Sequence, residues 1–295
     1  MAAFDNRIFK IVFTWGNDQA TLDSTQQTGS SGKFFAINAQ GTKYINAQQN
    51  ELSLQVANLS PTLRNQLLTQ LTPFNYDQKR KSVALYSGRV STGFFLLYQG
   101  DITECYPSQP PDITLNIKSK ANQFYKYDII AQAQNLTAPL SQIVANSANG
   151  LGLATRFEAT DKQIANYSYS GSRIQEVNHI GELGPYDVYT DDTTLVCKNK
   201  GVPLQNTGSI ISSDTGMIGQ PMPTEWGARV TTLLTQSVIL GGQFTVDSDI
   251  NPLMNGEYAI YKMGFSIASR EVPFYTLLEA TKNFDMYMNA GLPQA

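Results

Sequence analysis

The sequence is poor in the side chains that most enzymes and metal sites use. Its 295 residues include two cysteines and one histidine, and only 15% of them are charged. Two cysteines far apart exclude a disulfide scaffold, and with one histidine they form none of the spaced pairs of a zinc site. We expect Cys105 and Cys197 to be buried thiols of a soluble protein made in a reducing cytoplasm. We also expect no metal and no other cofactor.

The sequence also lacks a leader and a membrane-spanning run. No basic cluster precedes an apolar stretch near the N-terminus, which argues against a secretory signal. The longest uncharged stretch, residues 129–155, holds Pro139 and many amides that a bilayer would have to desolvate. We therefore expect no membrane insertion. We also expect the glycan acceptor patterns at Asn58, Asn135 and Asn166 to stay unmodified, because such a chain does not meet the glycosylating enzyme.

A strong net charge is lacking as well. The chain carries 21 basic and 24 acidic side chains, for a net charge of −3, which excludes a nucleic-acid binder of the usual electrostatic kind. The charge is +3 over residues 1–135, −2 over 136–206 and −4 over 207–295. Such a split favours head-to-tail contacts between molecules. In place of charges the chain has 21 Asn and 23 Gln, nearly as many amides as charged side chains.

Strand patterns dominate the beginning and the end of the chain. A hydrophobic fraction of 41% excludes intrinsic disorder, and the length predicts about two or three domains. Alternating apolar and polar residues, with many β-branched and aromatic side chains between turn formers, predict strands. These strands are expected at residues 8–15, 33–38, 51–56, 83–87, 93–102 and 113–119, and again at 229–234, 242–248, 256–267 and 272–280.

Helical patterns interrupt the strands. A first helix is predicted from the N-cap Ser60, with Pro61 at its first position and Leu71 on its apolar face, up to Pro73. The middle of the chain predicts a small α+β module. Its expected elements are a helix at 139–149 capped by Gly150, a strand at 151–157, a helix at about 172–183, and a hairpin of 187–189 with 194–198.

The sequence contains no convincing motif for nucleophilic catalysis, nucleotide binding or calcium binding. The single histidine, His179, falls inside a predicted helix, and we interpret it as a structural or surface residue. Residues 150–152 (GLG) begin like a dinucleotide loop, but they follow a helix and Thr155 replaces the third glycine, so we interpret them as a helix cap. Residues 247–251 (DSDIN) resemble the start of a calcium loop, but Pro252 stands where glycine is needed, which favours an ordinary loop.

Two further groups of charged side chains have both a functional and a structural interpretation. Paired acids for glycoside hydrolysis could come from Asp101, Glu104, Asp191 and Asp192, although exposed turn acids explain the last two equally well. Residues 79–81 (KRK) are the only basic run, and we favour a solvated loop over a phosphate-facing patch. The sequence therefore predicts no catalytic residue.

Three stretches taken together are similar to one known family. The first is residues 50–64 (NELSLQVANLSPTLR), with 96–103 (LLYQGDIT) beyond it. The second is 140–153 (LSQIVANSANGLGL), followed by 167–172 (YSYSGS). The third is 215–221 (TGMIGQP), then Leu233-Leu234, 255–258 (NGEY) and 277–280 (LLEA). In this order and spacing they resemble the baseplate hub proteins of tailed bacteriophages, the family that includes the T4-like tail hub.

The resemblance implies a fold that is mainly β with an α+β insertion. Residues 1–136 are expected to form a first tail-tube-like β-barrel domain, 137–206 the inserted α+β domain, and 207–282 a second tail-tube-like β-barrel domain. Residues 283–295 are expected to be a C-terminal tail that becomes ordered on a partner. The family carries no active site on these motifs, so the resemblance implies no enzymatic activity and no catalytic, cofactor-binding or metal-binding residue.

The implied function is structural. Three copies form a pseudo-sixfold ring that joins the tail tube to the central spike of a contractile tail and lets DNA pass during ejection. The implied partners are the other copies of a homotrimer, the tail tube protein, the central spike protein and other baseplate proteins, with the tape measure protein as a further candidate. The implied location is the tail baseplate of the virion, after assembly in the host cytoplasm. DNA is expected to cross the lumen without specific binding, which suits a lining of amides.

Two alternatives stay open at the level of the sequence. A cell-wall-binding or peptidoglycan-hydrolysing tail component is suggested by the α+β middle part. The equivalent hub of a contractile injection system fits all the features above. A stable trimer without cell-wall turnover distinguishes the hub from the first alternative, and neighbouring capsid genes distinguish it from the second.

Overall fold

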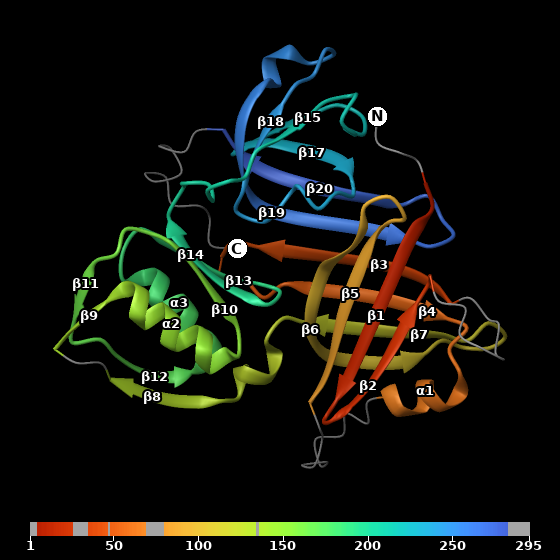
Figure 1. Cartoon of the computed structure of the whole chain (residues 1–295), viewed down its shortest axis with the longest axis horizontal. Coiled ribbons are helices and arrows are strands. Elements are labelled where there is room, and N and C mark those ends of the chain that lie inside the picture. The colour runs from red at the N-terminus through yellow and green to blue at the C-terminus, as the bar shows by residue number, and fades with distance from the viewer. Residues whose placement is uncertain (1–4, 26–34, 47, 69–79, 134–135, 283–295) are drawn as a thin grey trace.

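The structure, a computed structural model, describes residues 5–25, 35–46, 48–68, 80–133 and 136–282. As predicted, it is mainly β (Figure 1). Most strands belong to one sheet of 13 strands, in the order β16-β17-β20-β19-β3-β4-β7-β6-β5-β1-β2, with β18 pairing β19 and β15 pairing β18 outside this path. The strands of this sheet are β1 (Arg7–Trp15), β2 (Asp18–Asp23), β3 (Ala36–Tyr44), β4 (Glu51–Ala57), β5 (Lys81–Arg89), β6 (Gly93–Pro107), β7 (Thr114–Lys120), β15 (Ser209–Ile211), β16 (Met222–Thr224), β17 (Gly227–Leu233), β18 (Gln243–Val246), β19 (Gly256–Ala268) and β20 (Phe274–Thr281).

Strand β19 makes one sheet out of the two ends of the chain. This strand of 13 residues pairs with β18 near its start and with β3 over its second half, where Lys262 lies opposite Tyr44 and Ala268 opposite Asn38. Its other edge pairs with β20 from Ala259 to Ile267, with one irregularity after Ile260. The strand regions predicted at the two ends of the sequence are therefore joined by backbone hydrogen bonds.

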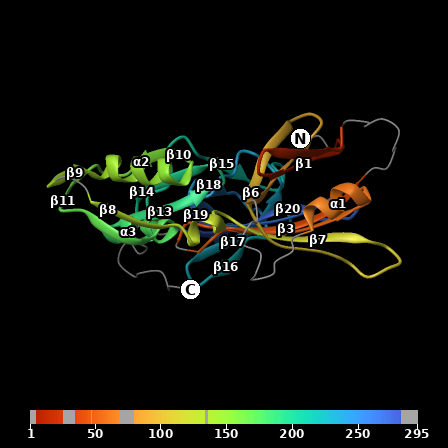
Figure 2. The same ribbon diagram turned by 90° about the horizontal axis from the view of Figure 1, so that it is seen from below.

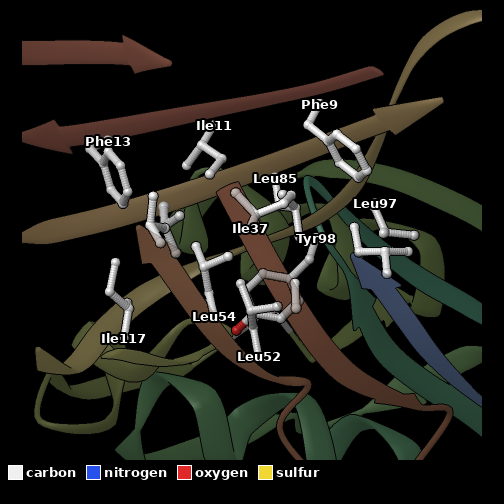
Figure 3. Packing of buried hydrophobic residues seen from close by; sticks show 14 of the residues in the cluster. Phe9, Ile11, Phe13, Ile37, Leu52, Leu54, Leu85, Leu97, Tyr98 and Ile117 are labelled. Atoms are coloured by element: carbon white, nitrogen blue, oxygen red, sulfur yellow. The ribbon is translucent and has the colours of Figure 1, made fainter. Parts of the chain in front are cut away.

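The first hydrophobic core lies under β1 and β3–β7. Alternation along each strand builds it: the burial of β4 alternates, so that Leu52 and Leu54 are buried while Glu51 and Ser53 are exposed. The second half of β19 and the start of β20 also reach this core. Figure 3 shows the side chains of β1 (Phe9, Ile11, Phe13) facing those of β3 and β4 (Ile37, Leu52, Leu54).

Side chains, and not backbone pairing, hold β1 against the turn between β19 and β20. Arg7 donates from Nη1 to the carbonyl oxygens of Ala268 (2.9 Å) and Glu271 (2.7 Å). The rings of Phe9 and Phe274 meet edge to face with centroids 6.0 Å apart. The start of β1 and the start of β20 therefore lie close together at one end of the first core.

A second core lies under β15–β20, and the rings of Phe244 and Tyr258 stack inside it at 5.8 Å. Helix α1 (Pro61–Leu67) covers part of the first core, and Ser60 caps it by accepting from the Leu63 amide at 3.3 Å. The predicted continuation of this helix past Leu67 is wrong at Leu68, which has already left helical geometry. Leu71 and Pro73 lie outside the described residues.

The middle of the chain forms the predicted helices, strand and hairpin around a third core. Gly152 caps α2 in the left-handed region at φ 68°, so the predicted cap at Gly150 is wrong by two residues. Helix α3 begins within one residue of the predicted start, and Ser172 caps it by accepting from the Gln175 amide at 3.4 Å. The elements of this part are η1 (Gln123–Lys126), β8 (Ile129–Ala133), β9 (Thr137–Pro139), α2 (Leu140–Leu151), β10 (Ala154–Glu158), β11 (Gln163–Ala165), β12 (Ser168–Ser172), α3 (Arg173–Glu182), β13 (Tyr186–Asp191) and β14 (Thr194–Asn199).

The β13–β14 hairpin separates the second core from the third. Tyr189 and Val196 point into the second core, while Leu195 and Cys197 point into the third. Cys197 and Cys105 are both buried and form no disulfide, as predicted. Figure 2 shows the helices of this part at one end of a flat molecule and α1 at the other.

Several short strands were not predicted. They are β2, β8, β9, β11, β12, β15 and β16, which have three to six residues each. Most are polar or too short for alternation to be recognised. The pairing partners of β8, β9, β11, β12 and β15 also lie more than 20 residues away in the sequence, whereas β2 and β16 form hairpins with the neighbouring strands β1 and β17. No helix among the described residues is long and apolar enough to cross a membrane. The predicted C-terminal tail, residues 283–295, lies outside the described residues.

Candidate functional site

The face of the large sheet opposite its cores is polar and open over six neighbouring strands. These are β17, β20, β19, β3, β4 and β7. Strand register aligns their outward side chains in rows across the sheet. One row runs Leu233, Tyr275, Ser266, Gln40, Ser53, Lys118, the next Thr231, Leu277, Gly264, Thr42, Glu51, Lys120, and a shorter one Asn38, Gln55, Asn116. We call these side chains, with Glu104, Arg229, Lys262 and Glu279 beside them, the polar face.

Each cation of the polar face lies against a carboxylate. Lys120 pairs with Glu51 at 2.7 Å, and Lys118 pairs with Glu104 at 2.9 Å. At the other end, one oxygen of Glu279 accepts from both Arg229 (3.1 Å) and Lys262 (3.3 Å), as the three lie opposite one another on adjacent strands. Exposed pairs of this kind stabilise a fold by only about 0–1 kcal/mol. Their main effect is a polar surface with little net charge.

A shallow hollow of about 680 Å³ lies in the middle of the polar face. Gly41 on β3 forms part of its floor. On the core side of Gly41, the ring of Phe265 occupies the space that a side chain at this position would need. A Cβ at Gly41 would overlap that ring and come within 2.9 Å of the Glu51 carbonyl oxygen. Glycine at this position therefore allows β3 and β19 to pack as one smooth sheet.

A second polar cluster is buried where the β13–β14 hairpin meets β3 and β6. Lys43, which is 3% exposed, donates from Nζ to Asp191 Oδ1 at 2.9 Å and to Asp192 Oδ2. The other oxygen of Asp192 accepts from the Gln99 amide at 3.0 Å. Asn50 adds a bond from Nδ2 to the Thr190 carbonyl oxygen at 2.9 Å. We call Lys43, Asp191 and Asp192 the hairpin clamp, because they attach the middle of the chain to the first β region.

Burial controls the ionisation of the hairpin clamp. It raises the pKa of Asp192 to about 6, although Lys43 opposes the shift. Burial also lowers the pKa of Lys43, but the two nearby carboxylates raise it by more, so Lys43 stays charged. Asp191 and Asp192 both bond the buried ammonium of Lys43, so their closeness to each other is explained by a structural role.

The carboxylates considered for glycoside hydrolysis divide between these two clusters and a third place. Glu104 belongs to the polar face, while Asp191 and Asp192 belong to the hairpin clamp. Asp101 is buried and accepts from Arg80 Nε at 2.7 Å. The expectation that Asp191 and Asp192 are exposed turn acids is wrong, because their side chains are only 25% and 10% exposed.

His179 lies on α3 and contacts aromatic rings. Its ring centroid is 5.3 Å from that of Tyr169 and 5.9 Å from that of Tyr167. Its Nδ1 lies 3.7 Å from Glu182 on the next turn. These contacts fit the interpretation of a structural histidine at the surface.

The basic run and the acidic loop also have structural roles. The guanidinium of Arg80 lies over the rings of Phe124 and Tyr125, at 5.2 Å and 5.0 Å. Lys81 donates to the Leu68 carbonyl oxygen at 3.1 Å, while Lys79 lies outside the described residues. The acidic loop 247–251 connects β18 to β19, and within the described residues no three His, Cys, Asp or Glu side chains are grouped as a metal site.

Sequence reasoning missed Lys43. It occupies an inward position of β3, where the alternation of Ile37, Ala39 and Gly41 continues toward the core. A lysine in the inward register of a strand predicts a buried carboxylate partner. That signal was present in the sequence, but the partner lies 148 residues away at Asp191.

Solved structures of tail proteins have the same fold. The 43 kDa tail protein of prophage MuSo2 from Shewanella oneidensis is similar with a TM-score of 0.61 and 9% identity, covering 95% of this chain and 98% of that one. A tail protein from Neisseria meningitidis is similar with a TM-score of 0.60 and 10% identity, over 95% and 98%. The E. coli c3393 protein, a type VI secretion component with structural similarity to the T4 tail proteins gp27 and gp5, follows with 0.59 and 11%, over 87% and 76%. The fold is thus that of phage tail proteins.

The sequence identifies the family to which the chain belongs. The family model described as Baseplate hub gp41 matches residues 8–280, nearly the whole chain. The chain therefore belongs to the baseplate hub gp41 family of bacteriophage tails, as the resemblance predicted. A comparison with curated proteins gives no match.

Proposed function

We propose that this chain is the structural hub of a phage tail baseplate, a trimeric ring that joins the tail tube to the central spike. The observation that carries the proposal is the polar face, a continuous sheet surface that crosses from one core to the other. We interpret β1–β7 and β15–β20 as two tail-tube-like barrels that share β19 and β20. In a ring of three copies these barrels give six similar units, which matches a sixfold tube to a threefold spike.

The domain boundaries follow from this interpretation. We assign residues 1–136 and 207–282 to the two barrel domains and 137–206 to the inserted α+β domain that the hairpin clamp fixes to them. The end of the first segment reaches into the middle region, where β8 (Ile129–Ala133) pairs with β12. Residues 283–295 serve as a tail for contacts with neighbours. Strand edges that are open in one copy are covered by neighbouring copies in the ring, which removes the risk of uncontrolled pairing.

The polar face lines the channel in this proposal. DNA binds proteins mainly through cations that neutralise its phosphates and release counterions. On the polar face each cation already pairs with a carboxylate, and the remaining positions are amides, hydroxyls and apolar groups. Such a wall gives passing DNA few phosphate contacts, so that ejection is not slowed by binding.

The partners and location follow from the same role. The hub contacts the tail tube protein, the central spike protein and other baseplate proteins, with the tape measure protein as a further candidate, in the virion after assembly in the host cytoplasm. It acts without catalysis. A hub in a contractile injection system is the second candidate function, favoured by the similarity of fold to the type VI secretion component.

Added positive charge on the polar face tests the proposal. Gln40→Lys with Ser53→Lys places two unpaired cations on the polar face, and we expect the assembled ring to bind duplex DNA at least about tenfold more tightly at low salt. The control is Tyr127→Lys with Leu136→Lys, which adds the same charge at exposed positions of the middle region. Equal DNA binding by the two double variants, measured by fluorescence anisotropy, would contradict a channel lined by the polar face.

A further inference from the structure

A groove lies where the start of β1 meets the turn between β19 and β20. Its volume is about 1030 Å³. Three apolar side chains on its rim are exposed: Val90 (63%), Ile218 (41%) and Val272 (89%). Apolar side chains gathered around a concave surface are typical of a binding site for another protein.

The groove also carries positive charge. The guanidinium groups of Arg7 and Arg89 both lie over the ring of Phe274, at 4.9 Å and 5.1 Å from its centroid. Burial, and after it the nearby charge of Arg89, lowers the pKa of Arg7. Asp5 is the one carboxylate among the described residues that line the groove. The groove therefore favours an occupant that is both apolar and acidic.

The connection between β18 and β19, residues 247–255, has this chemistry and projects from the molecule (Figure 1, top). Two of its apolar side chains, Ile250 and Leu253, are 72% and 91% exposed, while Met254 packs against the second core. Asp247 and Asp249 precede them and are exposed too. We call this connection the acidic tip.

The acidic tip has a fixed shape. The Ser248 amide donates to Asn255 Oδ1 at 2.8 Å, which closes the loop at its base. Tyr258 donates to the Met254 carbonyl oxygen at 2.8 Å, and η2 (Pro252–Met254) forms its end. A tip held in one conformation loses little conformational entropy when it binds, so its exposed Leu253 can serve as an anchor.

The acidic tip and the groove lie at opposite ends of β19. The tip ends where β19 begins at Gly256, and the groove adjoins the turn that follows Ala268. A strand of 13 residues spans about 40 Å at roughly 3.3 Å per residue. The tip of one chain therefore cannot enter its own groove, and any contact between them joins two copies.

We propose that the acidic tip of one copy docks into the groove of the next copy, with Ile250 and Leu253 against the apolar rim and the acids of the tip near Arg7 and Arg89. Two different surfaces meet in this contact, so repeating it generates a closed ring when the rotation fits. The tip belongs to the segment with a charge of −4 and the arginines to the segment with +3. The proposal rests on the hub function above and identifies the surfaces that build its ring.

Cysteine cross-linking tests the contact directly. Leu253→Cys in one sample and Val272→Cys in another replace exposed side chains, while the two native cysteines are buried. Under mild oxidation we expect a covalent dimer when the two samples are mixed and none from either sample alone. A chain that carries both changes is expected to give covalently closed rings. The matched control pairs Leu253→Cys with Tyr127→Cys, an exposed position in the middle region, and is expected to give no cross-link.

A second variant separates this proposal from the hub function. Leu253→Asp is expected to weaken self-association at least tenfold in sedimentation measurements, and added salt should weaken the wild-type contact. A trimer that forms unchanged with Leu253→Asp and gives no cross-link would overturn the tip contact and leave the hub function standing. A chain that is monomeric at every concentration, alone and with spike protein, would overturn both. A cross-link from Val272→Cys to Met288→Cys, but not to Leu253→Cys, would assign the groove to residues 283–295 and overturn the proposal.

Discussion

Lysine and carboxylate meet in two regions of this molecule under very different conditions. On the polar face, Lys120 lies 2.7 Å from Glu51, and the side chains are 44% and 55% exposed. In the hairpin clamp, Lys43 lies 2.9 Å from Asp191, with side chains 3% and 25% exposed. The distances are nearly equal, so the surroundings decide what each pair does. In water the pair only balances charge, whereas in the interior it fixes the orientation of a hairpin, since a buried ion without its partner is very costly.

The hairpin clamp is expected to show the largest effect on stability. Lys43→Met leaves two acids near each other in the interior, and we expect the free energy of unfolding to fall by about 3–5 kcal/mol. Lys120→Met on the polar face, the matched control, is expected to lower it by less than about 1 kcal/mol. Chemical denaturation measures the free energy of unfolding of both variants. Similar decreases for the two would contradict the difference between the buried and the exposed ion pairs.

The pH dependence of stability is a second test of the hairpin clamp. Burial raises the pKa of Asp192 from 3.8 to about 6, so the folded chain holds this proton more tightly than the unfolded chain. The free energy of unfolding is therefore expected to fall as pH rises from about 4 to 6, by at most about 3 kcal/mol from this group. Lys43 is charged throughout this window and adds no slope.

Asp192→Asn removes the titrating group. We expect its stability curve to be flatter than that of the wild type between about pH 4 and 6. Glu104→Gln changes an exposed acid of the polar face and should keep the wild-type slope. If Asp192→Asn keeps the wild-type dependence of stability on pH as well, burial does not raise the pKa of the Asp192 carboxyl.

Two glycines on adjacent strands test whether the two faces of the sheet differ in packing. A Cβ at Gly41 points into the first core against Phe265, while a Cβ at Gly264 points to the polar face and meets nothing closer than 3.7 Å. We expect Gly41→Ala to lower the free energy of unfolding by about 1–3 kcal/mol through overpacking. Gly264→Ala should change it by no more than about 0.5 kcal/mol. Thermal unfolding compares them, and equal melting temperatures would contradict the assignment of faces.

The exposed ion pairs of the polar face are expected to have the smallest effect on stability and a clear effect on DNA binding. Glu51→Gln with Glu104→Gln leaves Lys118 and Lys120 without their partners and should change the free energy of unfolding by less than about 1 kcal/mol. The assembled ring should then bind duplex DNA more tightly, with a dependence of log affinity on log salt that is steeper by about 2. Unchanged salt dependence would mean that DNA does not meet the polar face.

Much of the fold could be predicted because its main elements have local causes. Alternation identified β4 and β19 nearly to the residue, and the predicted cap Ser60 sets the start of α1. The order of β, α+β and β elements along the chain also followed from local patterns. The pairing of β19 with β3 could not be predicted, since it joins residues more than 200 positions apart whose polar sides look alike in the sequence.

The candidate site was harder to predict for the same reason. The abundance of amides predicts a polar channel lining, and that function stays a prediction. The rows that bring Gln40 beside Ser53 exist only once the strand register is fixed. Asp191 and Asp192 look like ordinary turn acids until Lys43 is placed beside them. Composition predicted the kind of surface, and tertiary packing decided where it lies.

The number of copies in solution tests the hub most simply. One chain has a mass of 32.5 kDa, so light scattering on the purified protein, alone and with its spike protein, distinguishes one copy from three without further assumptions. The proposed ring predicts a trimer, at least when the spike protein is present. A chain that remains monomeric in both samples at high concentration would contradict it.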